Sequence, residues 1–480
     1  MNTLNRYYPL IDDWAAFETI LFEPLPTCVW ANPLRITAEQ LAEIFTTEGI
    51  DFEPLAWQPG GFQLAPDFKP GHHWAFLAGL YHSQEAVSML PVLLLDPQPG
   101  ERVLDLCAAP GNKTAQIAVQ MGNRGTVVAN DINAGRMRAA RQTFERLGLL
   151  NVTTTTADGG NYPPAAGLFD KVLVDVPCSC EGTTRKEPII VERIGEAISC
   201  KKSGSQKALL RKAVQLCKPG GRIVYATCTY APEENELVVD AILRQHTSVR
   251  IVEADIAGLK MSPGITTWQG QALDPSLHLC RRVWPHHNNT GGFFIAVLEK
   301  EGQFPPLPQG EGSRVSDGVR AFLHDDLPPE TDAMLQTALQ RHGLQLDDLH
   351  PNIVFQPSRW RVYLTNPDHQ PLTAPEPEAE GMIFLNIKSK YPKLSTAAAQ
   401  WIDRKATQNT LDLDESQTRA YLNRERFDIT AAPGHLTGRG YILVRYRGFG
   451  LGVALYYPHQ DKLGGVIESL FPKGWSPVKT

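Results

Sequence analysis

The chain has 480 residues, of which 42% are apolar and 20% are charged, and its formal net charge is -6. This composition is typical of a folded globular protein of about three domains, and it excludes a disordered, collagenous or fibrous chain. The apolar runs are shorter than the ~20 residues that a membrane span needs, and the acidic N-terminus lacks the basic start of a signal peptide, so we expect a cytoplasmic protein outside the membrane.

Charge is distributed unevenly along the chain. Residues 1–100 hold 3 Lys and Arg against 12 Asp and Glu, a net of -9, whereas residues 101–300 hold 24 against 19, a net of +5. Residues 301–385 hold 5 against 13, a net of -8, and residues 386–480 hold 14 against 8, a net of +6. The two basic blocks permit a polyanionic partner, although an ordinary solvated surface explains them equally well.

From residue 102 onward, short apolar segments alternate with helical ones. This order predicts an α/β fold with a doubly wound, mostly parallel sheet. The expected strands are 102–106, 126–130, 152–156, 170–175 and 222–226, and the expected helices are 113–120, 134–147, 205–217 and 233–245. Residues 218–221 are expected to end the third of these helices, and the Pro-rich segments 303–312 and 371–381 are predicted linkers. Ligands of such sheets bind beyond the carboxyl ends of the strands.

The segments that follow the first three strands suit a nucleoside-like ligand. The first strand leads into the small-residue loop Asp105–Thr114, which lets a ligand approach the backbone and a helix N-terminus. The loop lacks the glycine spacing of a phosphate loop or a dinucleotide-binding turn, which argues against ATP and NAD. Asp131 and Asp158 follow the next two strands and could accept hydrogen bonds from a ribose and an adenine. Either aspartate alone would be read as a helix cap or a turn residue.

Eight cysteines are too few for a disulfide scaffold. Cys178 and Cys228 follow the fourth and fifth strands, and we expect them to face one crevice, whereas Cys107, Cys217 and Cys280 are expected to be buried and inert. The pair Cys178 and Cys180 has no second Cys or His pair at zinc-like spacing, so no metal is expected.

Four runs in fixed order carry a family resemblance: DLCAAPGNKT, DVPCSCEGTTRKEP, YATCTYAPEENE and RRVWPHHNNTGGFFIA. Over roughly residues 25–300 the chain resembles the NOL1/NOP2/Sun family of RNA 5-methylcytosine methyltransferases, above all its bacterial members that modify small-subunit ribosomal RNA. The resemblance implies a Rossmann-like class I methyltransferase domain with S-adenosyl-L-methionine as cofactor. It implies RNA as partner, namely 16S rRNA in or near the 30S subunit. The chain departs from the family at Asn112, Val176 and Cys180, where Gly, Ala and Gly are usual.

The resemblance also implies roles for individual residues. Cys228 would attack carbon 6 of cytosine, Cys178 would assist release of the carbon 5 proton, Asp175 would bind the base edge and Lys113 would orient the site. Asp131 would hold the ribose of the cofactor with support from Arg136, and Asp158 would hold the adenine. The remaining cofactor-binding residues implied are Ala108, Ala109, Pro110, Gly111, Asn112, Lys113, Thr114 and Asp175.

The expected domains are an N-terminal RNA-positioning domain over 1–65, the catalytic domain over 66–300, a linker with a small intermediate segment over 301–383, and a PUA-like RNA-binding domain over 384–480. Residues 440–455 predict a β-hairpin whose aromatic and basic side chains interleave, as in single-strand binders. Its aromatic residues could equally belong to a barrel core, while its arginines favour RNA contact. The residues concerned are Tyr441, Arg445, Tyr446, Arg447 and Phe449.

In the acidic N-terminal part, a short amphipathic helix is expected over 41–45. Only Arg35 and the cluster at residues 72–74 offer RNA contacts there. A helix is expected near residues 331–341, without an assigned function.

Two alternatives to ribosomal RNA methylation remain open. The first is the same chemistry on transfer RNA, since catalytic motifs do not encode the target. The second is a non-catalytic ribosome-assembly factor that keeps the fold. A DNA cytosine methyltransferase fits less well, because in that class the Pro-Cys cysteine attacks and the Thr-Cys cysteine has no counterpart. We expect a monomer.

Overall fold

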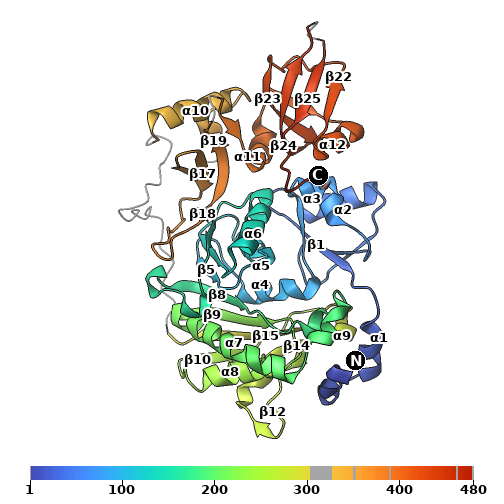
Figure 1. Ribbon diagram of the computed structural model, residues 1–480, viewed down its shortest axis with the longest axis vertical. Helices are drawn as coiled ribbons and strands as arrows, with labels where there is room; N and C mark the ends of the chain where they lie inside the picture. The colour runs from blue at the N-terminus through green and yellow to red at the C-terminus, as the bar shows by residue number, and fades with distance from the viewer. Residues whose placement is uncertain (1, 303–326, 350–352, 389–390, 461–462, 478–480) are drawn as a thin grey trace.

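A computed structural model describes residues 2–302, 327–349, 353–388, 391–460 and 463–477, arranged as modules stacked along one long axis (Figure 1). The central module lies in the lower half of the view, and the C-terminal modules lie above it. Within the described residues, no helix is both long and apolar enough to cross a membrane.

The central module is built on a twisted sheet. Its strands β7, β6, β5, β8 and β9 are parallel neighbours in that order, and β15 joins β9 in the antiparallel direction. The bounds are β5 (Arg102–Asp105), β6 (Thr126–Asn130), β7 (Val152–Thr155), β8 (Phe169–Asp175), β9 (Cys217–Thr227) and β15 (Phe293–Lys300). The smaller strands β10 (Val249–Val252), β11 (Ser262–Pro263) and β14 (Arg281–Val283) extend the β15 side. The predicted doubly wound, mostly parallel sheet is confirmed.

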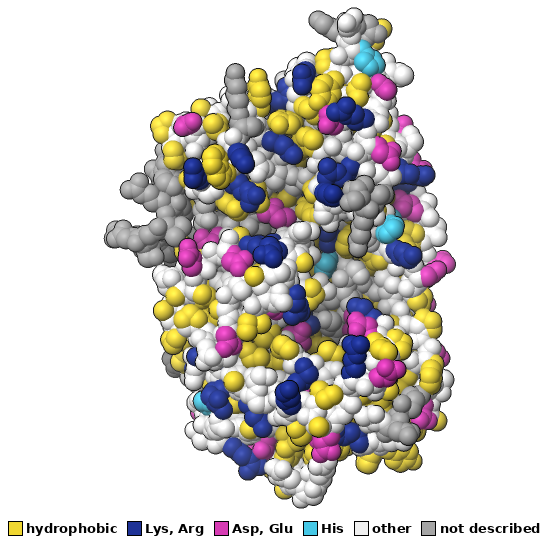
Figure 2. Space-filling view, viewed as in Figure 1, with side chains coloured by type: hydrophobic (Ala, Val, Ile, Leu, Met, Phe, Trp, Pro, Cys, Tyr) yellow, Lys and Arg dark blue, Asp and Glu magenta, His cyan; other side chains and the backbone are white. Residues whose placement is uncertain are grey.

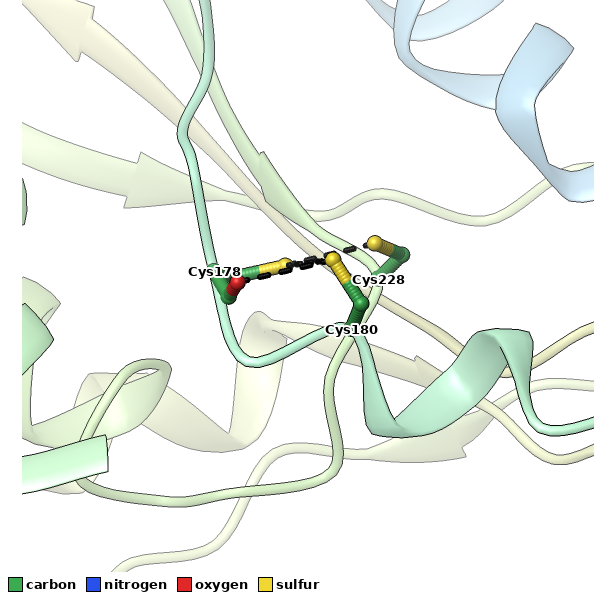
Figure 3. A group of neighbouring side chains, drawn as sticks. All are labelled: Cys178, Cys180 and Cys228. Carbon is green, nitrogen blue, oxygen red and sulfur yellow. Dashed lines mark hydrogen bonds between the residues drawn. The ribbon is translucent and has the colours of Figure 1, made fainter. Parts of the chain in front are cut away.

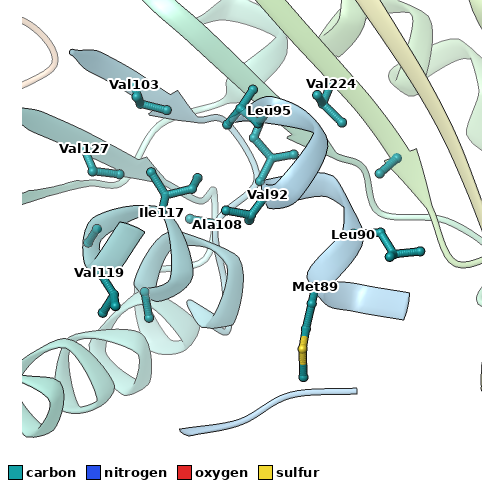
Figure 4. Packing of buried hydrophobic residues seen from close by; sticks show 14 of the residues in the cluster. Met89, Leu90, Val92, Leu95, Val103, Ala108, Ile117, Val119, Val127 and Val224 are labelled. Carbon is teal, nitrogen blue, oxygen red and sulfur yellow. The ribbon is translucent and has the colours of Figure 1, made fainter. Parts of the chain in front are cut away.

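Helices cover both faces of this sheet. One face buries α4, α5 and α6 against the strands, and the apolar side chains of this layer interlock around Val92, Val103 and Val127 (Figure 4). The other face carries α7 and α8. The bounds are α4 (Leu90–Leu95), α5 (Asn112–Gln120), α6 (Ala134–Leu147), α7 (Glu196–Leu216) and α8 (Glu236–Leu243).

The end of α7 differs from the sequence-based expectation. The helix begins at Glu196, not at Ser205, and it passes directly into β9 at Cys217. Residues 218–221 therefore lie in a strand and do not form a helix-ending turn. The reason is tertiary: β9 continues its pairing with β8 as far as Phe169, and Lys218 forms an ion pair with Asp170 at 2.6 Å.

The N-terminal module has an antiparallel sheet in the order β2, β3, β1, β4. The bounds are β1 (Thr27–Ala31), β2 (Phe52–Pro54), β3 (Gly61–Leu64) and β4 (Tyr81–Ser83). The expected amphipathic helix is part of α2 (Ala38–Thr47). Thr37 caps the N-terminus of this helix and forms a reciprocal capping box with Gln40. The domain division expected at residue 65 falls between β3 and β4. The preceding segment, η1 (Asn2–Leu10) and α1 (Trp14–Ile20), packs on the central module beside α9 (Pro285–Asn288).

Two further sheets form the C-terminal modules. The first has the order β16, β17, β19, β20, and the second β21, β23, β24, β25, β22. The strand bounds are β16 (Val354–Pro357), β17 (Arg361–Thr365), β19 (Met382–Asn386), β20 (Lys393–Leu394), β21 (Thr410–Asp412), β22 (Arg426–Ile429), β23 (Gly440–Tyr446), β24 (Phe449–Pro458) and β25 (Gly465–Ser469). The helices are α10 (Pro329–Gln340), α11 (Thr396–Ile402) and α12 (Glu415–Leu422). The expected hairpin is β23 with β24, and the helix expected near 331–341 is α10. The division expected after residue 383 falls within β19.

The segment 371–381 is not a free linker. Its strand β18 (Ala379–Glu380) pairs antiparallel with β7 at the edge of the central sheet, and Glu378 forms an ion pair with Arg141 at 3.1 Å. An edge strand has unpaired backbone groups that such a segment satisfies, which composition alone does not reveal. The other predicted linker, 303–312, lies outside the described residues.

The N-terminal module and the five-stranded C-terminal sheet share one hydrophobic core, although they lie at opposite ends of the sequence. Trp74, on the short helix α3 (Trp74–Leu77), meets Tyr446 edge to face with ring centroids 5.0 Å apart. Glu48 accepts a hydrogen bond from the Trp74 indole at 2.8 Å and pairs with Arg447 at 2.9 Å. Arg445 pairs with Asp403 at 2.5 Å. Both arginines therefore have carboxylate partners within the protein, and the expectation that Arg445 and Arg447 contact RNA stays a prediction.

Candidate active site

The carboxyl ends of β8 and β9 bring three cysteine thiols together. The Sγ atoms of Cys178 and Cys228 are 3.2 Å apart, and those of Cys178 and Cys180 are 4.0 Å apart (Figure 3). Parallel neighbouring strands end at the same edge of a sheet, which is why cysteines 50 residues apart in the sequence meet. The expectation that Cys178 and Cys228 share a crevice is thus matched by their placement, and Cys180 joins them.

Hydrogen bonds hold the two cysteine-bearing loops in register. Gly182 donates its backbone N–H to the carbonyl of Cys228 at 2.9 Å, and Ser179 Oγ lies 2.7 Å from Thr229 Oγ1. Glu181 accepts hydrogen bonds from the Thr229 hydroxyl at 3.1 Å and from the Tyr7 hydroxyl at 2.7 Å. The N-terminal segment thereby buttresses the thiol site, a role that sequence reasoning did not assign to Tyr7.

The three thiols are hydrogen-bonded to one another, and these bonds shift their pKa values in different directions. The hydrogen bond from Cys178 lowers the pKa of Cys180. Hydrogen bonding to Cys180 and Cys228, together with burial, raises the pKa of Cys178. The hydrogen bond from Cys178 lowers the pKa of Cys228. The hydrogen bond with Cys180 and burial raise it by more, so the net shift of the Cys228 pKa is upward. Cys180 is therefore the thiol of this cluster whose pKa is lowered.

A lysine–aspartate pair lies beside the thiols. Lys113, on the first turn of α5, donates to Asp175 Oδ2 at 2.6 Å and to Ser88 Oγ at 2.7 Å. Burial alone would discharge the lysine, but the charge of Asp175 outweighs it and raises the pKa of Lys113. Lys113 and Asp175, predicted separately from two motifs, thus form one ion pair at the end of β8.

The small-residue loop between β5 and α5 is closely packed. Gly111 has a φ of 102°, and a Cβ there would lie 2.8 Å from Ala140 Cβ of α6, so only glycine fits this turn. The backbone N–H of Ala109 donates to Asp131 Oδ2 at 3.2 Å, and Arg136 donates to the carbonyl of Ala109 at 2.5 Å. Ala108 is buried with the loop, whereas Pro110 is exposed. The predicted cofactor loop therefore lies directly against Asp131 and Arg136.

Two residues of this region, Thr114 and Asp158, form hydrogen bonds to other groups of the protein. Thr114 is fully buried and its hydroxyl donates to Asp105 Oδ2 at 2.7 Å, while burial raises the pKa of Asp105 to about 7. Asp158 is exposed after β7, where it accepts from the backbone of Gly160 at 3.0 Å and caps a short turn. The cap and the expected adenine contact are compatible, because each carboxylate oxygen accepts more than one hydrogen bond.

Asn112, which the family resemblance marks as a departure, takes part in a network with His82 and Arg146. Asn112 Oδ1 lies 3.1 Å from His82 Nε2, and Arg146 donates to His82 Nδ1 at 2.8 Å. Since Nδ1 accepts, Nε2 carries the proton and donates to Asn112. Burial and the charge of Arg146 lower the pKa of His82 to about 3. Sequence reasoning missed His82 and Arg146, and no motif marks them.

The strand order and the ligand-binding edge define a class I methyltransferase fold. Solved structures support this class, including a methyltransferase homolog protein from Pyrococcus horikoshii, with a TM-score of 0.53 and 32% identity, over 62% of this chain and 99% of that one. Family models match in three places: 16S rRNA methyltransferase RsmB/F over residues 92–299, the N-terminal domain of 16S rRNA methyltransferase RsmF over 4–86, and the methyltransferase RsmF PUA domain over 408–476.

Curated relatives agree with these models. The tRNA (cytosine(49)-C(5))-methyltransferase of Pyrococcus abyssi is 35% identical over 61% of this chain and 94% of its own length. The ribosomal RNA small subunit methyltransferase F of Erwinia tasmaniensis is 33% identical over 64% of each chain. The chain therefore belongs to the RsmB/RsmF group of the NOL1/NOP2/Sun family of RNA cytosine-C5 methyltransferases. The chain spans 38% to 64% of the length of three ribosomal RNA methyltransferases that it matches, those of mouse, human and Erwinia tasmaniensis.

Proposed function

We propose that this chain forms 5-methylcytosine in small-subunit ribosomal RNA, with S-adenosyl-L-methionine as methyl donor and Cys228 as nucleophile. The observation that carries the proposal is the 3.2 Å approach of the Cys178 and Cys228 sulfurs beside the Lys113–Asp175 pair. A family member with both thiols and this ion pair in one crevice has every protein group that the reaction needs.

The first step makes carbon 5 of cytosine reactive. The Cys228 thiolate adds to carbon 6, forming a carbon–sulfur bond and placing electron density on carbon 5. Asp175 binds the N3/N4 edge of the ring and stabilises the protonated adduct, while Lys113 holds the carboxylate in position. The cofactor supplies a methyl group on a sulfonium.

The second step frees the product. After methylation carbon 5 still carries its proton, and the carbon–sulfur bond breaks only when that proton leaves. Cys178, next to Cys228, removes the proton directly or through water, and the electron pair of the carbon–hydrogen bond restores the ring double bond as Cys228 departs. Cys178 thereby determines turnover, not attack.

The residues around the small-residue loop fit this cofactor. Gly111 lets the loop turn directly against α6, and α5 begins at Asn112, so the N-terminus of this helix faces the loop. Asp131, at the end of β6, is a carboxylate suited to ribose hydroxyls, with Arg136 3.6 Å away, and Asp158 at the end of β7 suits an adenine amino group. The loop Ala108–Thr114 would hold the methionine part.

Basic side chains support an RNA partner. Figure 2 shows Lys and Arg distributed over one face, from the C-terminal modules to the central one, with acidic side chains between them. The charges of Lys202 on α7 and Arg136 on α6 help to lower the pKa of Cys180. A target base must leave its stack to enter such a crevice, and phosphates beside it would meet these cations.

Alanine variants test the roles of the two thiols. With Cys178→Ala, attack and methylation continue while release slows, so a denaturant-resistant protein–RNA adduct accumulates. With Cys228→Ala no adduct forms and no 5-methylcytosine appears. Activity of the Cys228→Ala variant would assign the nucleophile elsewhere.

Methyl-labelled cofactor and three substrates test the target. Undermodified small subunits, free ribosomal RNA and transfer RNA are incubated separately, digested and assayed for 5-methylcytosine. Label in small-subunit RNA supports the proposal. Label in transfer RNA alone would favour the activity that the Pyrococcus abyssi relative is named for. Cofactor binding without label in any substrate would favour a non-catalytic assembly factor.

A further inference from the structure

Cys180 gives this site a third sulfur that the proposed methyl transfer does not use. Its φ of 64° is left-handed, a conformation that favours glycine. The Cys180 thiol lies 3.4 Å from the carbonyl of Cys178, and its sulfur is close to both other sulfurs (Figure 3). The sulfur of Cys180 thus belongs to one cluster with the sulfurs of Cys178 and Cys228.

The distances among the three sulfurs match a thiolate metal site. All three Sγ atoms lie within 4.8 Å of one another, with two separations of 3.2 and 4.0 Å. Zinc bonds thiolates at about 2.3 Å, which places sulfurs of a tetrahedral site about 3.8 Å apart. The 3.2 and 4.0 Å separations lie within about 0.6 Å of that value.

We propose that Cys178, Cys180 and Cys228 together bind one soft d10 cation, of which Zn²⁺ is the type. Three thiolates occupy three positions of a tetrahedron, and water completes the fourth. Binding forms three metal–sulfur bonds and releases the thiol protons to solvent, with no change of oxidation state. The spacing of Cys178 and Cys180 does not reveal the site, because Cys228 lies on another strand.

The surroundings favour such an ion. Hydrogen bonds between the two loops hold the sulfurs in place before binding, so little order is lost when the ion enters. Three thiolates and Zn²⁺ carry a net charge of -1, and Lys202 and Arg136 act on Cys180 with the opposite sign. Soft sulfur ligands select zinc-like ions over Mg²⁺ and Ca²⁺.

Binding of the ion should inhibit methylation, a consequence that rests on the proposed function. A metal-bound Cys228 cannot add to cytosine, so the ion acts as a reversible inhibitor. Because Cys180 supplies the third sulfur, this chain is more sensitive to the ion than a variant that keeps only Cys178 and Cys228.

Cd²⁺ is the probe for binding, because cadmium–thiolate bonds absorb in the ultraviolet. The full chain, reduced and stripped of metal, is titrated anaerobically. We expect one Cd²⁺ per chain with the intensity of three thiolates. Cys180→Gly, which relieves the backbone strain, should weaken binding at least tenfold, and Cys200→Ser, at an exposed cysteine away from the cluster, should not change it. Equal affinity of wild type and Cys180→Gly, or absence of the thiolate band, overturns the site.

Zinc inhibition provides the second readout. The methylation rate of each variant is compared with its own zinc-free rate, and wild type should be inhibited at zinc concentrations at least tenfold below those needed for Cys180→Gly. Cadmium binding without methylation of any RNA would leave the site standing and overturn the proposed function. Methylation without cadmium binding would do the reverse.

Discussion

Lys113 Nζ donates to Asp175 Oδ2 at 2.6 Å, joining the first turn of α5 to the carboxyl end of β8. The lysine side chain is 11% exposed and the aspartate side chain 28%, so the pair is shielded on the lysine side and open on the other. An accessible carboxylate held by a buried cation can receive a ligand without moving.

Replacing Lys113 by Met should lower kcat about 100-fold if Asp175 binds the base as proposed, because the carboxylate loses the charge that holds it in position. The assay is labelled-methyl transfer to small-subunit RNA at saturating cofactor. Ser88→Ala is the control: it removes the other hydrogen bond of Lys113 and keeps the ion pair, so we expect less than about a tenfold loss. A Lys113→Met enzyme within threefold of wild type would show that the pair has only a structural role.

Alkylation should distinguish the three clustered thiols. The thiolate is the reactive form, and the hydrogen bond from Cys178 lowers the pKa of Cys180 while the pKa values of Cys178 and Cys228 are raised. At pH 6, brief treatment with iodoacetamide should label Cys180 first. Peptide mass spectrometry measures the order, and preferential labelling of Cys228 would contradict this distribution of charge.

Stability should fall as pH is lowered, through His82. The folded protein holds its pKa at about 3, against 6.5 for the free side chain, so between these values the unfolded state binds a proton that the folded state does not. This difference removes about 2 kcal/mol between pH 7 and pH 5. Urea unfolding at both pH values should show a smaller loss for His82→Gln than for wild type. The exposed His72→Gln is the control and should match wild type.

Trp74→Ala should destabilise both ends of the chain together. Trp74 is 7% exposed in the core shared by the N-terminal module and the C-terminal sheet, and such truncations cost about 3 kcal/mol. Denaturant unfolding measures the loss. Phe22, 75% exposed, provides the control, since Phe22→Ala should stay within about 0.5 kcal/mol of wild type. An equal, small effect of both variants would mean that the two modules are not coupled through this contact.

Several features of the molecule follow from local sequence. Alternating strands and helices between residues 102 and 245 predict the parallel sheet. The spacing of apolar residues and the turn residues between segments are properties of the local sequence. Cys178 and Cys228 could be selected as site residues because each follows a strand, and strand ends converge in this fold. Asp175 and Lys113 were named only through the family resemblance. Gly111 could likewise be expected at a tight turn.

Other features were decided only by contacts between distant segments. Nothing near Arg445 or Tyr446 shows that Asp403 and Trp74 would engage them, so a hairpin that reads as an RNA surface partly faces the N-terminal module. The composition of segment 371–381 predicts a linker, but its strand β18 pairs with the open edge of β7. The sequence does not show that Asn112 is hydrogen-bonded to His82, which is in turn hydrogen-bonded to Arg146. The sequence by itself determined the elements, the sheet and the residues at strand ends, since periodicity and turn chemistry are short-range. The tertiary structure alone decided which charges pair, which aromatic side chains are buried and that a third sulfur joins two others, because burial and pairing depend on the separation of atoms in space.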